Sequence, residues 1–455
     1  MVEVEKEMKN VLVVGGGARE HALCNAVSRS ENVRLFSVMK NVNPGIKKIS
    51  QRFLQENETN ISEIVSFAEK QEIDLVFIGP EAPLEAGLTD ALQQKQIPVC
   101  APTQAAARIE TNKEWMRDLL SKHDITGQLK YKSFQSLQSA KEFIKELNGN
   151  VVLKPIGLTG GKGVKVAGDH FTDIQGAIEY INKIFTERIG GASKLVIEEK
   201  AEGEEFTVQA FTDGKTVKTF PAVQDHKRLQ PGDTGPNTGG MGSYSKENGL
   251  LPFLSQHEYD EAVHILEEIV NALAKEGYPY IGPIYGQFML TAEGPKVIEI
   301  NARFGDPEAM NVLPLLQTDF IEIAQAMLTK QLNSVKIDFL NKATVCKYVV
   351  PEGYGVKSVS NKIIKLDEDA IENTGALLFY ASVNQDDSMV KTTSSRSLAV
   401  VGIADSIAKA ETMCENALEH VSSDHIYMRH DIGTNDLIQK RIDHMNQLRK
   451  METTV

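Results

Sequence analysis

The sequence predicts a multidomain α/β protein, and three observations support this fold class. The chain has 455 residues, which at roughly 100 to 200 residues per domain suggests about three globular units. Strand-like and helix-like segments alternate through the first hundred residues, a pattern typical of βαβ units on a parallel sheet. Further along, strands follow one another across polar loops, which indicates mixed α+β domains.

Composition is that of an ordinary soluble globular protein, with 41% hydrophobic and 24% charged residues. The formal net charge of −13 argues against nonspecific binding to nucleic acid, although local lysines can still bind small anions. No segment offers about 18 consecutive apolar residues, and the acidic start "MVEVEKEMKN" does not resemble a signal peptide. The four cysteines have no paired spacing, so neither a zinc site nor a disulfide framework is predicted. We therefore expect a cytoplasmic protein with no membrane or nucleic-acid partner.

The first 105 residues predict the parallel sheet. Strand-like "VLVV", "VRLFSV", "IDLVFIG" and "IPVC" alternate with helical segments at 19–30, 61–70 and 83–95. The turn "GGGARE" begins like a dinucleotide-binding fingerprint, but Glu20 occupies the third glycine position and no acidic residue ends the second strand. We therefore expect this helix N-terminus to face an anionic group rather than a nicotinamide or flavin.

A join marked by Pro and Thr near residue 105 begins a second region, which contains the glycine-rich segment "KPIGLTGGKGV" at 154–164. A P-loop is excluded, because Ile156 stands at the position of its first glycine and Gly163 follows Lys162 where Ser or Thr is required. Instead, a strand ending at Lys154 runs into a turn whose N–H groups can surround an anion. A flexible surface hairpin is the alternative interpretation.

Two polar segments follow. "LVIEEKAEGEEF" at 195–206 changes from an apolar strand to an acidic turn. Such a hinge can offer backbone groups to an adenine edge and a carboxylate to ribose hydroxyls, although acidic turns are often merely solvated. The loop "PGDTGPNTGGMGSYS" at 231–245 is rich in Gly, Pro and Thr, so composition alone also allows a disordered linker.

The segment "PKVIEIN" at 295–301 carries the clearest chemical pattern. Alternate side chains of a strand share a face, so Glu299 and Asn301 point the same way. A carboxylate and an amide oxygen beside nucleotide phosphates suit Mg²⁺, and Gln287 on the preceding strand can lie opposite and add a third oxygen. A solvated hairpin edge would alternate in the same way.

The turn after this strand, "ARFGDPE", places Arg303, Asp306 and Glu308 close together. The planar guanidinium of Arg303 matches a carboxylate or a phosphate, and the two acids can hold an amine or sugar hydroxyls. A simple internal ion pair is the alternative.

In this order, Lys113, "KPIGLTGGKGV", "IEEKAEGEEF", "QDHKR…DTGPNTGGMG" and "EINARFGDPE" resemble the ATP-grasp superfamily and, within it, the glycinamide ribonucleotide synthetase family. "GAREHA" at 17–22, "GPEAPL" at 79–84 and "RHDIG" at 429–433 are similar to that family's motifs too, so the resemblance covers nearly the whole chain. It implies an N-terminal α/β substrate domain with a parallel sheet over 1–105. An ATP-grasp domain of two α+β subdomains follows over 106–330, with 128–200 as a mobile lid. A small β-rich C-terminal α+β domain over 331–455 would close the substrate cleft.

The resemblance also implies roles for individual residues. Lys113 and Lys154 would hold the phosphates of ATP, and Glu205 would hold the ribose. The flap over the nucleotide would contain Gly157, Gly160, Gly161, Lys162 and Gly163. The adenine would be bound by Glu198, Glu199, Lys200 and Ala201. Mg²⁺ or Mn²⁺ would be bound by Gln287, Glu299 and Asn301. The substrate pocket would be lined by Gly17, Arg19, Glu20, Glu81, Lys227, Thr238, Gly239, Gly240, Met241, Gly242, Asp306 and Glu308. The catalytic residues would be Arg303, facing the acyl phosphate or glycine carboxylate, Asp225, and His226, which either handles a proton or makes a structural hydrogen bond.

The activity implied by the resemblance is ATP-dependent ligation of glycine to 5-phosphoribosylamine. The reaction passes through glycyl phosphate, gives glycinamide ribonucleotide, ADP and phosphate, and belongs to de novo purine biosynthesis. It needs no protein nucleophile, in keeping with a sequence that shows no Ser-His-Asp or Cys-His motif. We expect a monomer or weak homodimer.

Three departures from the family pattern are visible. Asn112 precedes Lys113 where the family often has Ser, and the flap reads "KPIGLTGG" where "KADGLAAG" is commoner. Met310 and Asn311 in "DPEAMN" replace the usual "DPET", which bears on the substrate pocket. The alternatives to the implied activity are another ATP-grasp carboxylate–amine ligase with a different acid substrate, and a nucleotide-sensing module without turnover.

Overall fold

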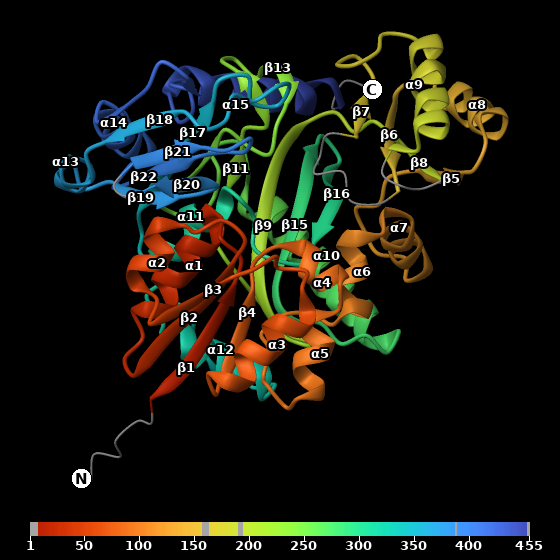
Figure 1. The fold of residues 1–455 in the computed structure, drawn as a ribbon. Helices are drawn as coiled ribbons and strands as arrows, with labels where there is room; N and C mark the ends of the chain where they lie inside the picture. The colour runs from red at the N-terminus through yellow and green to blue at the C-terminus, as the bar shows by residue number, and fades with distance from the viewer. Residues whose placement is uncertain (1–7, 157–162, 190–193, 387–388, 453–455) are drawn as a thin grey trace.

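The computed structural model describes residues 8–156, 163–189, 194–386 and 389–452. The predicted α/β class is confirmed: a parallel sheet near the N-terminus, two antiparallel sheets in the central region and a β-rich C-terminal part. Figure 1 shows the N-terminal domain and the C-terminal domain stacked on one side of the long central strands, with a smaller lobe on the other side. In the described residues, no helix is long and apolar enough to cross a membrane.

The N-terminal domain is built on one parallel sheet in the order β3-β2-β1-β4. Its strands are β1 (Lys9–Val14), β2 (Val33–Met39), β3 (Arg52–Gln55) and β4 (Leu75–Ile78), and its helices are α1 (Ala18–Ser28), α2 (Pro44–Ile49), α3 (Ile61–Lys70), α4 (Glu81–Glu85), α5 (Leu88–Gln94) and α6 (Gln104–Thr111). The "VLVV" run is fully buried because helices cover both faces of the sheet. The expected strand "IPVC" forms only a single bridge between Val76 and Val99, whereas β3 was not predicted.

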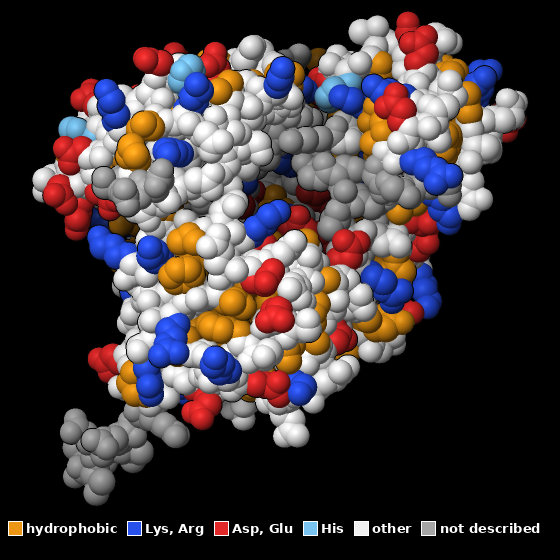
Figure 2. Space-filling view, in the orientation of Figure 1, with side chains coloured by type: hydrophobic (Ala, Val, Ile, Leu, Met, Phe, Trp, Pro, Cys, Tyr) orange, Lys and Arg blue, Asp and Glu red, His pale blue; other side chains and the backbone are white. Residues whose placement is uncertain are grey.

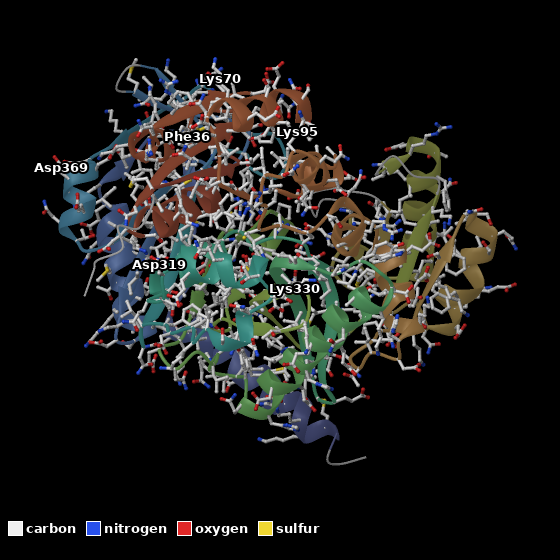
Figure 3. The ribbon with its side chains drawn as sticks, turned by 90° about the horizontal axis from the view of Figure 1, so that it is seen from below. Phe36, Lys70, Lys95, Asp319, Lys330 and Asp369 are labelled. Atoms are coloured by element: carbon white, nitrogen blue, oxygen red, sulfur yellow. The ribbon has the colours of Figure 1, made fainter. Side chains whose placement is uncertain are left out.

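The smaller lobe, residues 128–200, is called the lid below. Its antiparallel sheet has the order β5-β8-β6-β7 and carries two helices on one face. The elements are β5 (Tyr131–Phe134), α8 (Leu137–Glu146), β6 (Val151–Pro155), β7 (Lys165–Val166), α9 (Ile174–Glu187) and β8 (Leu195–Glu199). Its buried apolar side chains form a separate cluster drawn only from the lid itself. Seen from below, the lid again stands apart, at the side opposite helix α13 (Glu368–Asn373), which Asp369 marks (Figure 3).

The central body carries the antiparallel sheet β10-β9-β15-β16. Its elements are α7 (Lys113–Lys122), β9 (Glu204–Asp213), β10 (Val217–Thr219), α10 (Gln256–Lys275), β15 (Ile281–Thr291), β16 (Gly294–Asn301), α11 (Glu308–Val312), α12 (Phe320–Leu328) and two 3-10 turns, Leu313–Leu315 and Leu332–Ser334. Helix α10 begins at a capping box in which Ser255 and Glu258 satisfy each other's backbone N–H groups. The β15–β16 hairpin sets Gln287 opposite Glu299, as predicted.

The C-terminal domain differs from the sequence prediction in two ways. First, β11 (Gln224–Asp225) and β14 (Gly242–Ser245), expected in the ATP-grasp region, join the C-terminal sheet β11-β14-β17-β22-β19, in which β24 also pairs with β17. Second, one helix was predicted in the last 120 residues, yet the described part contains α13 (Glu368–Asn373), α14 (Ile407–Leu418) and α15 (Asn435–Glu452). The remaining strands are β12 (Arg228–Gln230), β13 (Thr234–Asn237), β17 (Ala343–Pro351), β18 (Ile363–Leu366), β19 (Leu377–Tyr380), β20 (Val383–Asp386), β21 (Met389–Thr392), β22 (Leu398–Ala404), β23 (Val421–Ser422) and β24 (Ile426–Met428).

Apolar packing joins the N-terminal, central and C-terminal parts into one unit. Each of the two large hydrophobic clusters contains residues from all three parts, from Leu12 to Met445 in one and from Val11 to Ile432 in the other. Between these parts and the lid, Figure 2 shows a hollow in which acidic and basic side chains are visible. The candidate site lies among the strands that meet here.

Candidate active site

The predicted metal-binding side chains lie together on the β15–β16 hairpin. Glu299 and Asn301 share one face of β16, where the Asn301 amide donates to Glu299 over 3.3 Å. Gln287 is the cross-strand neighbour of Glu299 in β15. The hairpin therefore presents one carboxylate and two amide groups to the same space, an arrangement rich in the oxygen ligands that Mg²⁺ prefers.

Three lysines predicted to bind anions surround this carboxylate. Burial by itself would raise the pKa of Glu299, but the positive charges of Lys227, Lys154 and Lys113 outweigh it and lower this pKa. Lys113 begins helix α7, directly after its capping residue Asn112, Lys154 lies on the lid strand β6 and Lys227 follows β11. Three separate parts of the chain thus concentrate positive charge at one point.

Lys154 is fixed at the base of the lid by a buried ion cluster. Its Nζ lies 2.7 Å from Glu198 Oε2 on β8 and donates to the Ile298 carbonyl over 3.0 Å. Arg117 from helix α7 binds both oxygens of Glu198, each over 2.8 Å, and also donates to Ile298. Burial lowers the pKa of Lys154, whereas Arg117 and Lys154 lower that of Glu198 against the effect of burial. With both oxygens engaged, Glu198 positions Lys154, and its predicted adenine contact stays a prediction.

Arg303 lies just after strand β16, between two acidic side chains. Its Nη2 is 3.0 Å from Glu110 Oε1, and its Nε is 3.5 Å from Glu81 Oε2. Glu110 also accepts the Ala302 N–H over 2.6 Å, and burial raises the pKa of Glu110 to about 7. Although burial would lower it, these acids raise the pKa of Arg303, so the guanidinium is held charged in a fixed orientation.

The turn at Gly17 is closed by its own glutamate. Glu20 accepts the Gly17 N–H over 2.7 Å and pairs with Arg19, whose guanidinium reaches the Phe304 carbonyl over 3.3 Å. A Cβ on Gly79 would collide with Glu20 at 2.1 Å, so this turn is packed around the carboxylate. The expected anionic group at the N-terminus of α1 is therefore, in part, an internal side chain.

A second polar network extends from the hairpin toward Lys227 and Glu308, which are predicted to line the substrate pocket. Glu205 at the start of β9 accepts from the Gln287 amide and lies 3.5 Å from Lys227 Nζ. Tyr285 donates to Glu308 over 2.9 Å and to Gln287 over 3.4 Å. Despite burial, the surrounding acids Glu205, Glu299, Asp225 and Glu308 raise the pKa of Lys227.

Asp225 and Glu308 form a buried acidic pair. Burial and the charge of Glu308 raise the pKa of Asp225 well above its usual range, and burial also raises the pKa of Glu308. Among the described residues, Asp225 Oδ1 has no hydrogen-bond partner. The atom faces Gly240, where a Cβ would come within 2.8 Å of it. A positively charged group placed beside this pair would be bound favourably, because it would stabilise the ionised form of both carboxylates.

In the loop 238–242, residues 238–240 form a turn, and Met241 and Gly242 after it are buried. Thr238 donates to the Lys227 carbonyl over 2.8 Å and accepts the Gly240 N–H over 3.1 Å, so the turn of Thr238, Gly239 and Gly240 is ordered rather than a loose linker. Met241 is fully buried in the core, which leaves its side chain unable to line the pocket. Gly242 belongs to β14, where a Cβ would meet a carbonyl of β17 at 2.2 Å.

Arg396 reaches this loop from the C-terminal domain. It pairs with Asp306 over 2.8 Å and donates to the Gly239 carbonyl over 2.6 Å. Its guanidinium lies 4.4 Å from the ring centre of Tyr348, whose hydroxyl also donates to Asp306 over 2.6 Å. Asp306 is therefore held by two C-terminal side chains.

His226 lies on the side of its segment that faces away from the lysines. Its Nδ1 is 3.1 Å from Asp233, its side chain is buried, and burial lowers its pKa. Asp233 is paired in turn with Arg429 over 2.8 Å and with Arg441. These contacts support the structural one of the two predicted roles.

The predicted adenine segment is tied to the lid by its side chains. Glu199 accepts the Lys130 N–H over 2.9 Å, and Lys200 donates to the Ala167 carbonyl over 2.9 Å. The predicted flap residues Gly157, Gly160, Gly161 and Lys162 lie outside the described residues. Gly163 is described, and its carbonyl accepts the Tyr180 hydroxyl over 2.7 Å.

Sequence reasoning missed four residues that the structure places in this site: Arg117, Glu110, Tyr285 and Arg396. Each contacts a predicted site residue from another element, and none lies in a recognisable motif. Only Arg117 had a sequence signal, because it lies one helical turn after Lys113 on the same predicted helix.

The chain was compared with protein families, curated sequences and solved structures. Residues 9–110, 111–309 and 344–435 match the N domain, the ATP-grasp (A) domain and the C domain of phosphoribosylglycinamide synthetase. The phosphoribosylamine–glycine ligase of Methanothermobacter thermautotrophicus is 50% identical over 96% of this chain and 99% of its own length. That of Methanocaldococcus jannaschii is 49% identical over 97% of this chain and its full length.

Two solved structures show the same architecture. A phosphoribosylamine–glycine ligase from Thermotoga maritima has a TM-score of 0.77 at 25% identity and covers 93% of this chain and 99% of its own. A biotin carboxylase domain from Hydrogenobacter thermophilus, solved with MgADP and bicarbonate, has a TM-score of 0.74 at 14% identity over 97% of this chain and 98% of its own. The second likeness concerns the fold alone.

Proposed function

Because the chain belongs to the phosphoribosylglycinamide synthetase family, we propose that it is a phosphoribosylamine–glycine ligase of de novo purine biosynthesis. It couples ATP hydrolysis to the ligation of glycine to 5-phosphoribosylamine and gives glycinamide ribonucleotide, ADP and phosphate. The observation that carries the proposal is the convergence of Lys113, Lys154 and Lys227 on Glu299 beside Arg303, because phosphates and a carboxylate must meet in this reaction.

The first step is phosphoryl transfer to glycine. A carboxylate oxygen of glycine attacks the γ-phosphorus of ATP, the bond from that phosphorus to the bridging oxygen breaks, and ADP leaves as glycyl phosphate forms. Lys154 and Lys113 hold the phosphates, while Arg303, fixed between Glu81 and Glu110, orients the glycine carboxylate. Positioning and charge neutralisation supply the rate, without a protein nucleophile.

The hairpin residues fit a divalent metal. Glu299 is kept ionised by the lysines around it, and the amide groups of Gln287 and Asn301 lie beside it. We assign Glu299, Asn301 and Gln287 as ligands of Mg²⁺ or Mn²⁺, which when bound supplies charge neutralisation at the phosphates of ATP. Glu205 at the ribose and the 198–201 segment at adenine complete the nucleotide site.

The second step forms the amide. The amine nitrogen of phosphoribosylamine attacks the carbonyl carbon of glycyl phosphate, the carbon–oxygen bond to phosphate breaks, and the nitrogen's proton passes to the departing phosphate. Asp225 and Glu308 hold the amino group of the glycyl moiety, since a cation favours the ionised form of two carboxylates whose pKa values burial raises, with the charge of Glu308 adding to the rise at Asp225. Thr238, Gly239, Gly240 and Asp306 with the Gly17 turn line the pocket for phosphoribosylamine.

A coupled assay of ADP formation tests the function. With ATP and Mg²⁺, we expect sustained ADP release only when glycine and phosphoribosylamine are both present, the latter formed from ribose 5-phosphate and ammonia. Glycinamide ribonucleotide should form at the same time as the ADP. Turnover with another acid in place of glycine would favour a different ATP-grasp carboxylate–amine ligase. ATP binding without turnover under any of these conditions would favour a nucleotide-sensing module.

We further propose that the enzyme works in the cytoplasm as a monomer or weak homodimer, and that the lid moves as a unit during turnover. Its separate hydrophobic cluster supports motion as a unit, because in the described part of the chain that cluster contains apolar side chains of the lid and none of the central body.

A further inference from the structure

Helix α15 is connected to two active-site segments through one side chain. Arg441 Nη1 lies 3.0 Å from Glu204 Oε2 at the start of β9, and its Nη2 pairs with Asp233 in the loop after β12. His444, one turn further along α15, lies 2.7 Å from the other oxygen of Glu204. Glu204 is almost completely buried by these contacts. Helix α15 begins at Asn435, the residue at which the match to the C domain ends.

The partners of Arg441 lie directly behind residues of the candidate site. Glu204 precedes Glu205, whose carboxylate faces Gln287 and Lys227 on the other side of the strand. Because successive side chains of an extended chain point to opposite faces, fixing Glu204 from behind fixes the direction of Glu205 in front.

The same alternation applies to the second partner. Asp233 holds His226 over 3.1 Å, and His226 stands between Asp225 and Lys227, which face the candidate site. Arg429 also binds Asp233, together with Asp431, which accepts the Gly232 N–H over 2.8 Å. Arg429 therefore binds the loop, whereas Arg441 binds both the loop and β9.

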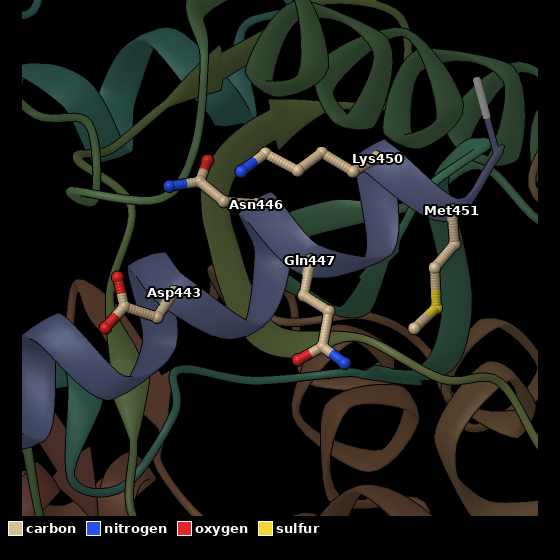
Figure 4. A pocket seen from close by; sticks show the side chains of 5 residues that line it. All are labelled: Asp443, Asn446, Gln447, Lys450 and Met451. Carbon is tan, nitrogen blue, oxygen red and sulfur yellow. The ribbon is translucent and has the colours of Figure 1, made fainter. Parts of the chain in front are cut away.

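Ion pairs supplement apolar packing between α15 and β9, because Ile438 and Met445 of the helix belong to the same hydrophobic cluster as Val208 of the strand. A groove of about 730 Å³ runs between the helix and Gly203–Glu204, and Arg441 and His444 are among its lining residues. A second groove of about 520 Å³ is lined by side chains from successive turns of α15, from Asp443 to Met451 (Figure 4). Loss of the Arg441 pairs therefore leaves the helix packed in place but removes its polar link between Glu204 and the loop that carries Asp233.

We propose that Arg441 is a positioning residue that holds Glu205, on the nucleotide side, and Asp225 with Lys227, on the glycine side, at a fixed separation. Its guanidinium provides two acids with charge-assisted hydrogen bonds at once, which a lysine cannot do with the same geometry. The identity of the ligand on the glycine side rests on the proposed function, whereas the link between β9 and the loop does not.

Three variants test the proposal: Arg441→Gln, Arg441→Lys and the control Arg449→Gln. Arg449 also anchors α15, but to Glu258 over 2.7 Å and to the Phe253 carbonyl, away from the site. We expect Arg441→Gln to raise the KM values for ATP and for glycine by roughly 10-fold or more each, as expected when positioned groups shift. Arg441→Lys should show an intermediate effect, and Arg449→Gln should change Tm without changing either KM.

The result that overturns the proposal is an equal effect of Arg441→Gln and Arg449→Gln on KM, or a loss confined to Tm. Full activity of Arg441→Lys would likewise contradict the need for both ion pairs. The dissociation constant of a non-hydrolysable ATP analogue, measured by calorimetry, provides a readout without turnover. If the wild-type protein forms no ADP with glycine and phosphoribosylamine, the proposed function fails, while a raised analogue dissociation constant in Arg441→Gln still supports the positioning role.

Discussion

Replacing Lys154 by Met tests the role of this lysine in ATP use separately from its contribution to the free energy of unfolding. Lys154 donates one of the three hydrogen bonds that Glu198 accepts, and Arg117 donates the other two. The buried carboxylate therefore keeps its bidentate partner, and the loss of one charge-assisted hydrogen bond should cost about 1.5 to 3 kcal/mol of unfolding free energy. Breaking the pair altogether would cost about 3 to 5 kcal/mol.

Turnover should fall as well, because the proposed position of this charge is next to the transferring phosphoryl group. We expect kcat/KM for ATP to fall by roughly 10² or more, which corresponds to about 2.7 kcal/mol of transition-state stabilisation. Phosphate release at varied ATP concentration measures this loss, and thermal unfolding monitors the fold. The matched control is Lys194→Met, since Lys194 also bridges the lid to α7, through Glu114 at 3.1 Å, but is exposed. Unchanged ATP dependence in Lys154→Met, or an equal loss in Lys194→Met, would refute the assignment.

Three further outcomes are expected. Glu299→Ala should abolish Mg²⁺-dependent turnover while circular dichroism shows an intact fold, and near-normal rates would contradict the metal assignment. Arg396→Gln should raise the KM for phosphoribosylamine by roughly tenfold, as expected for one lost charge-assisted contact to Asp306, with the KM for ATP as the internal control; equal changes in both would argue for a general loss of folding. Burial lowers the pKa of His21 from 6.5 to about 4, so between these values the unfolded state binds the proton and stability falls with falling pH, by about 3 kcal/mol in total. His21→Asn, which keeps an acceptor for the Tyr380 N–H, should lose less stability than wild type between pH 6.5 and 4 in urea unfolding; identical pH slopes would exclude His21 as the cause.

The sequence predicted those parts of the site that depend on local geometry. Glu299, Asn301 and Gln287 share one hairpin, and strand alternation alone places them on one face. Arg117 and Glu198, by contrast, are 81 residues apart, and Arg396 is 157 residues from Gly239. Such contacts depend on how the domains pack, for which a single sequence carries no periodic signal.

The missed C-terminal elements have a related cause. Helix α15 reads "NDLIQKRIDHMNQLRKME", and its buried apolar positions are Leu437, Ile438 and Met445. Its attachment depends on ion pairs as well as on these side chains, so the usual apolar stripe of an amphipathic helix is thin. The short strand β14 was hidden for another reason: its pairing partner β17 lies about a hundred residues further along, and glycine and serine in "GSYS" do not favour a strand by themselves.

The loop 231–245 and the lid are held in place around the site by different kinds of contact. The loop 231–245 is held by backbone pairing of β14 with β17 and by Arg396 and Arg441, so it shares the rigidity of the C-terminal domain. Among the described residues, the lid shares no apolar cluster with the body, and the buried Arg117–Glu198–Lys154 cluster joins the two. Because this cluster ends on the carbonyl next to Glu299, any change in lid position moves Lys154 relative to Glu299 and the hairpin. Under the proposed role of Lys154 at the phosphates, the contact that orients the lid also places this lysine, and we expect binding of ATP and placement of the lid to be coupled.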